Sequence, residues 1–83
     1  MNYTAKQLRQ LARDLIEYET SFQIIQFTKT DRRSNTVEVE CRNLYSKPLI
    51  LIGQINNYNI ELRSPDGTII SRKTINRKKV SYL

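Results

Sequence analysis

Apolar residues near the start of the chain recur at helical spacing. They follow the i, i+3, i+4, i+7, i+8 pattern of a single helix face: Leu8, Leu11, Ala12, Leu15 and Ile16. Thr4 and Gln7 fit a capping box, in which each side chain binds the other's backbone N–H at the start of a helix. The pattern therefore predicts an amphipathic helix over residues 4–19.

The next two segments change to the two-residue period of β-strands. Residues 36–42 alternate cleanly, with three apolar residues on one side: Val37, Val39 and Cys41. Residues 22–29 alternate imperfectly, because Ile24 and Ile25 are adjacent. Either a bulge shifts the phase of this strand, or both of its faces are covered. A polar hairpin loop over residues 30–35 joins the two strands.

Three more strand-like runs, residues 49–55, 58–63 and 68–75, are separated by two turn signals. Asn56–Asn57 suits a two-residue hairpin turn, because asparagine tolerates positive φ. Ser64–Gly67 has proline and glycine where a type I turn favours them. Residues 76–83 follow as a basic tail, with a sixth short strand as the alternative.

The two-residue turn predicts a register for the hairpin on either side of it. This register pairs Ile55 with Tyr58, Gly53 with Ile60, and Leu51 with Leu62, so that all six share one apolar face. Residues 49–55 are apolar at nearly every position, which indicates a central strand covered on both sides.

Together these elements predict an α+β fold in one domain, residues 1–83. The N-terminal amphipathic helix packs on a five-stranded antiparallel meander sheet, with a sheet curled toward a small barrel as the alternative. A helix followed by five strands is similar to the order of elements in small Sm-like barrels. No residue motif accompanies this resemblance, and an analogy of fold implies no function.

The composition argues against most catalytic chemistry. The 83 residues include no histidine and a single cysteine, Cys41, which we expect to be a buried apolar side chain. We therefore expect no enzymatic activity, no metal site and no cofactor. No apolar run is long enough to span a bilayer, so the sequence predicts a cytoplasmic protein without a transmembrane segment.

The net charge of +6 is unevenly distributed. Basic and acidic residues balance over residues 1–41, so the whole excess lies in residues 42–83. Such asymmetry favours a polyanionic partner, and the candidate contacts are Arg63, Arg72, Lys73, Arg77, Lys78 and Lys79. Two other basic groups are interpreted as solvated side chains: Lys6, Arg9 and Arg13 on the helix, and Arg32 and Arg33 in the first hairpin loop.

Two functions are compatible with this pattern. The first is a non-enzymatic protein-interaction module or accessory subunit that docks on a protein partner or a second copy through its sheet. Its candidate surface consists of Leu49, Ile50, Ile52 and Tyr58. The alternative is a nucleic-acid-binding protein that uses the basic residues 63–79 with little dependence on sequence. Binding to a membrane surface is not expected, because the basic tail has little apolar anchorage.

Overall fold

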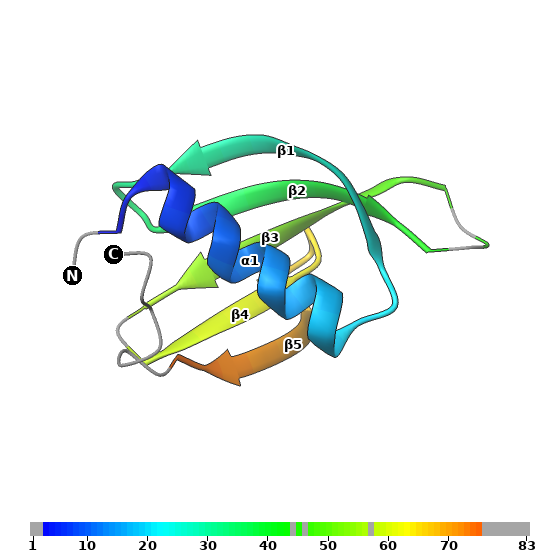
Figure 1. The fold of residues 1–83 in the computed structure, drawn as a ribbon. Helices are drawn as coiled ribbons and strands as arrows, with labels where there is room; N and C mark the ends of the chain where they lie inside the picture. Colours follow the sequence, from blue (N-terminus) through cyan, green and yellow to red (C-terminus); the bar gives the residue numbers. More distant parts are fainter. Residues whose placement is uncertain (1–2, 44, 46, 57, 76–83) are drawn as a thin grey trace.

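The computed structural model describes residues 3–43, 45, 47–56 and 58–75, and the predicted tail over residues 76–83 lies outside these ranges. One helix, α1 (Ala5–Glu19), crosses one face of an antiparallel sheet (Figure 1). The sheet contains five strands: β1 (Gln23–Asp31), β2 (Thr36–Arg42), β3 (Leu49–Ile55), β4 (Asn59–Arg63) and β5 (Ile69–Thr74). No helix within the described ranges is long and apolar enough to cross a membrane.

The strands lie in the sheet in the order in which they occur in the chain, from β1 to β5. Each strand pairs antiparallel with its sequence neighbour, which confirms the predicted α+β meander. Among the described residues, β1 and β5 are the two edges of an open sheet. The sheet is therefore not closed into a barrel in this part of the chain.

The start of α1 has the capping box that the sequence predicts. The backbone N–H of Gln7 donates to Thr4 Oγ1 over 3.1 Å, and the backbone N–H of Thr4 donates to Gln7 Oε1 over 2.8 Å. These bonds pair two backbone donors that the helix itself leaves without acceptors. Tyr3, immediately before the cap, is buried together with Leu8 in the core.

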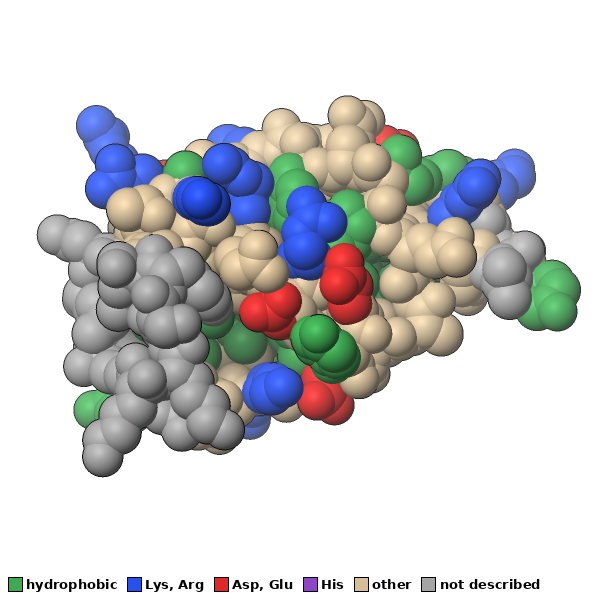
Figure 2. All heavy atoms as spheres, in the orientation of Figure 1, with side chains coloured by type: hydrophobic (Ala, Val, Ile, Leu, Met, Phe, Trp, Pro, Cys, Tyr) green, Lys and Arg blue, Asp and Glu red, His purple; other side chains and the backbone are tan. Residues whose placement is uncertain are grey.

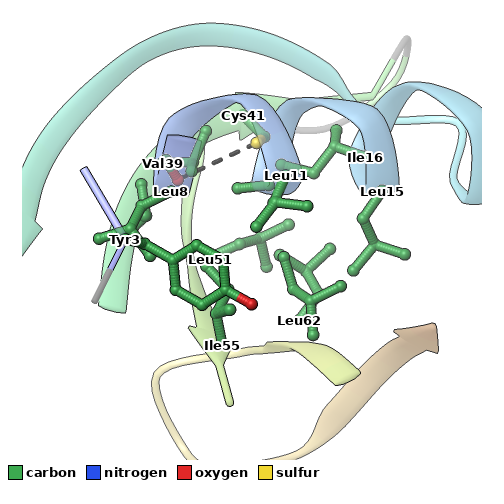
Figure 3. Close-up of a cluster of buried hydrophobic side chains, with 13 residues drawn as sticks. Tyr3, Leu8, Leu11, Leu15, Ile16, Val39, Cys41, Leu51, Ile55 and Leu62 are labelled. Carbon is green, nitrogen blue, oxygen red and sulfur yellow. Dashed lines mark hydrogen bonds between the residues drawn. The ribbon is translucent and has the colours of Figure 1, made fainter. Parts of the chain in front are cut away.

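A single apolar core fills the space between α1 and the sheet. Leu8 and Leu15 of α1 point toward Leu51 and Leu62 of the sheet (Figure 3), and all four side chains are almost completely buried. Val37, Val39 and Cys41 have no exposed surface, as the alternation of β2 predicts. The helix comes close to the sheet at Gly53, where an added Cβ would lie 3.5 Å from Ala12 Cβ.

The irregular pattern of the first strand comes from two bulges. The pairing of β1 with β2 skips Ile25, between Ile24 and Gln26, and skips Thr28, between Phe27 and Lys29. The bulges turn Ile24 and Phe27 to the core side of the sheet, where they pack against the buried cluster. Of the two explanations for this strand, the bulge is therefore correct.

The predicted register of the β3–β4 hairpin is wrong by two residues. Ile55 pairs with Ile60, and Gly53 pairs with Leu62. The reason is the turn, because the Asn56 N–H donates to the Asn59 carbonyl and the Asn56 side chain accepts from the Asn59 N–H. A shift of two residues keeps every side chain on its face, so the apolar side of the hairpin is preserved.

The β4–β5 turn follows the predicted chemistry. The Gly67 N–H donates to the Ser64 carbonyl over 2.9 Å, and Gly67 has a φ of 92°. These features describe a type I turn followed by a left-handed residue, which closes a three-residue hairpin loop. The carboxylate of Asp66 also accepts from the Thr68 N–H over 3.0 Å, which stabilises the loop from inside.

Candidate functional site

The sheet face opposite α1, which we call the outer face, holds the candidate interaction surface. The buried residues of β2 and β3 point toward the helix, so the residues between them point outward. Ile50 and Ile52 of the central strand β3 lie on this face and are half-buried. The sequence predicts a cover for this side of β3, but no helix of the described residues lies on it.

The charged side chains on the two sides of Ile50 and Ile52 are of opposite sign. Cross-strand pairing sets Glu38 beside Ile52, and Ile52 beside Arg63, so that the three form one row across the sheet. The half of the outer face on β1 and β2 carries one net negative charge from Lys29, Asp31, Glu38, Glu40 and Arg42. The half on β4 and β5 carries one net positive charge from Glu61, Arg63 and Arg72.

Glu61 organises the positive half of the outer face. Arg63 Nη2 lies 2.6 Å from Glu61 Oε2, and Arg72 Nη2 lies 2.7 Å from Glu61 Oε1. The hydrogen bond from Arg63 and the two guanidinium charges hold the pKa of the Glu61 carboxyl below its usual value. Glu61 therefore stays ionised at neutral pH and fixes both arginines on the outer face.

The predicted interaction residues do not all share this face. Ile50 and Ile52 do, whereas Leu49 is half-buried on the helix side, where it packs against the core. Tyr58 lies in the β3–β4 hairpin with 76% of its surface exposed, so its predicted place on the apolar face is wrong. The physical reason is the turn described above, which replaces Tyr58 with Ile60 as the partner of Ile55.

The predicted polyanion contacts are divided between both faces of the sheet. Arg63 and Arg72 lie on the outer face and share Glu61, which neutralises one of their two charges. Lys73 lies on the helix side, where its Nζ is 3.6 Å from Glu19 Oε1. The remaining candidates, Arg77, Lys78 and Lys79, fall outside the described residues. The described members of the set therefore form no single basic surface.

A basic surface does form elsewhere, from the two groups that the sequence presents as separate solvated charges. Arg32 Nε of the β1–β2 hairpin donates to the Tyr3 carbonyl over 3.2 Å, which brings the hairpin loop beside the start of α1. Arg13 of α1 lies over the Phe27 ring of β1, and helical spacing puts Lys6 and Arg9 on the same face of α1 as Arg13. Figure 2 shows basic side chains gathered over this part of the molecule. Sequence reasoning missed this surface because about twenty residues separate its two parts along the chain.

The described residues offer no arrangement for metal binding. No group of three or more His, Cys, Asp or Glu side chains in the described ranges could hold a metal ion. Cys41 has no exposed surface, and desolvation in the core, with a smaller effect of Glu40, raises its pKa to about 11.

Comparison of the chain with models of protein families, with curated proteins and with solved structures gave no match.

Proposed function

We propose that this protein is a small non-enzymatic interaction module that docks through the outer face of its sheet, and that its partner there is a second copy of the chain. The observation that carries the proposal is the row of Glu38, Ile52 and Arg63 across the sheet. An apolar centre with a negative charge on one side and a positive charge on the other is complementary to itself.

A two-fold axis along β3 would use this self-complementarity. The axis runs parallel to β3, midway between the two outer faces, so β3 of one copy faces β3 of the other. The strands on either side of β3 exchange places, so β2 of one copy faces β4 of the other. Glu38 of each copy then faces Arg63 of the other, and Ile52 faces Ile52. The isoleucines supply burial, while the charges set the orientation of the two copies.

The size of the outer face sets the strength expected of this dimer. Five strands about 4.8 Å apart and about 20 Å long cover roughly 500 Å² per copy. A standard stable interface buries about 800 Å² per partner. The surface is smaller than that, and its large apolar residues include Ile50, Ile52 and Ile69, the last of which pairs with Arg63 at the edge of the face. We therefore expect a dissociation constant in the micromolar range.

Cysteine cross-linking tests the predicted geometry. Ile52→Cys should form a disulfide-linked dimer on mild oxidation, because two residues on the axis approach each other closely. Arg72→Cys is the matched control, since it lies on the same face but away from the axis. The native Cys41 has no exposed surface and should contribute no background. Non-reducing gels and mass spectrometry measure the product.

Sedimentation of the unmodified chain over a range of concentrations provides the second measurement. A monomer–dimer equilibrium together with selective cross-linking at position 52 supports the proposal. The proposal is wrong if the protein remains monomeric at hundreds of micromolar, which corresponds to an association free energy of roughly −5 kcal/mol or weaker. It is also wrong if positions 52 and 72 cross-link equally.

A further inference from the structure

The helix side of the molecule carries a second charged surface, independent of the outer face. It consists of five cations, which we call the basic surface: Lys6, Arg9 and Arg13 of α1, and Arg32 and Arg33 of the β1–β2 hairpin. Figure 2 shows basic side chains gathered over the first half of α1 and the neighbouring hairpin. Lys6, Arg13, Arg32 and Arg33 are exposed, and Arg9 is half-buried.

Several contacts hold the two parts of the basic surface in place. Arg32 is tied to the Tyr3 carbonyl, and the guanidinium of Arg13 lies over the Phe27 ring at 5.2 Å from its centroid. The hairpin loop is ordered by Asp31, whose carboxylate accepts from the Arg33 N–H over 2.9 Å. Arg13 and Arg32 are therefore positioned before any ligand arrives, which lowers the entropic cost of binding for these two side chains.

Most of this charge is not neutralised by the protein itself. Of the five cations, Arg13 has an ion pair with a described residue, Glu17, at 3.8 Å and largely exposed to solvent. The charged side-chain nitrogens of the other four form no ion pair within 4 Å with a carboxylate in the part of the chain that the structure describes. Arg63, Arg72 and Lys73, by contrast, are all paired with glutamates.

We propose that the basic surface binds the phosphate backbone of duplex nucleic acid. Lys6, Arg9 and Arg13 lie within an arc of about 60° on α1, and they extend for about 10 Å along its axis. One strand of a duplex presents a phosphate about every 3.4 Å along the duplex axis. The helix thus spans about three phosphates, and Arg32 and Arg33 extend the positive surface beyond its N-terminal end.

The placement of the described aromatic side chains favours a duplex over a single strand. Unpaired bases usually stack on exposed aromatic side chains beside the cations. No exposed tyrosine of the described residues belongs to the first half of α1 or to the β1–β2 hairpin: Tyr18 is in the last turn of α1, Tyr45 lies between β2 and β3, and Tyr58 is in the β3–β4 hairpin, which neighbours the β1–β2 hairpin at the same end of the sheet. Contacts to phosphate alone carry no base information, so the binding should be independent of sequence.

A pair of matched double variants tests this assignment. Lys6→Gln with Arg33→Gln removes two charges from the basic surface, and neither side chain makes a hydrogen bond or ion pair with a described residue. Arg42→Gln with Lys47→Gln removes two exposed charges at the opposite end of β2. Both variants therefore have the same net charge, and circular dichroism checks that both are folded.

Fluorescence anisotropy with a short labelled duplex of random sequence, measured across a salt series, gives the readout. The unmodified chain should bind with a steep dependence of log K on log salt. The Lys6/Arg33 variant should reduce the slope by about 1.8 and weaken binding roughly tenfold or more at low salt, since each cation accounts for about 0.9 of slope. The Arg42/Lys47 variant should keep the slope of the unmodified chain.

Other outcomes overturn the proposal. Equal losses in the two variants would mean that net charge alone attracts the duplex. The absence of duplex binding at low salt would exclude the site, and tighter binding to the single strand would exclude the duplex as its ligand. Vesicles containing anionic phospholipid, tested in parallel, would identify a membrane surface instead if they bind and the duplex does not.

Discussion

Cys41 shows how the core changes the chemistry of one side chain. Its thiol is fully buried, and the lack of water around it raises its pKa to about 11. Because the thiolate is the nucleophile, a thiol with this pKa stays protonated and inert at neutral pH. The clean alternation of β2 already indicates this burial, since it sets Cys41 on the same side as Val37 and Val39.

We therefore expect Cys41 to resist alkylation in the folded protein. Iodoacetamide at about pH 8, near the ordinary pKa of a free thiol, should modify it at least a hundredfold more slowly than after unfolding in urea, as measured by mass spectrometry. Lys47→Cys in the same chain provides an internal control, because position 47 is exposed and its thiol should react at an ordinary rate. Rapid modification of Cys41 in the folded chain would contradict the burial described here.

At the scale of elements, the packing of α1 on the sheet depends on Gly53. A Cβ at this position would lie 3.5 Å from Ala12 Cβ and 3.9 Å from the Val37 carbonyl oxygen, which are ordinary contact distances. Alanine should therefore fit, whereas the two further methyl groups of valine should force the helix and the sheet apart.

Gly53→Val should lower the free energy of unfolding by about 1–3 kcal/mol. Gly53→Ala, the matched control, should change it by less than about 1 kcal/mol, because Ala meets only ordinary contacts and regains some strand propensity. Urea denaturation followed by circular dichroism measures both. Equal stability of the two variants would show that α1 does not approach the sheet closely at this position.

The elements themselves could be predicted from local patterns, but the irregularities between them could not. The helix, its capping box and the β4–β5 turn depend on residues a few positions apart, so the sequence predicts them correctly. The register of the β3–β4 hairpin depends on the hydrogen bonds between Asn56 and Asn59, which close a longer turn than the two-residue turn that the sequence predicts. The basic surface requires Arg32 to reach Tyr3, a tertiary contact that no local period signals.

At the scale of the whole molecule, the outer face and the basic surface lie on opposite sides of the sheet. The outer face belongs to the sheet, and the basic surface lies on the side of the sheet that α1 covers. A dimer formed through the outer faces would therefore direct its two basic surfaces away from each other. Such a dimer could hold two duplexes at once.

Bridging of two duplexes tests this arrangement. Protein bound to an immobilised duplex should capture a second, labelled duplex at concentrations where the dimer forms. Ile52→Lys should abolish capture, because it sets two like charges together on the axis, while single-duplex binding by anisotropy changes less than about threefold. Capture that survives this substitution would show that bridging does not need the outer face.

The order of the strands also bears on how the chain reaches this structure. Every strand pairs with its immediate neighbour in sequence, so each pairing closes only a short loop. Proteins whose contacts are mostly local fold faster than those whose partners are far apart in the chain. The sheet can therefore grow one hairpin at a time, and the docking of α1 on β4 and β5 is the step that joins the two ends of the described chain.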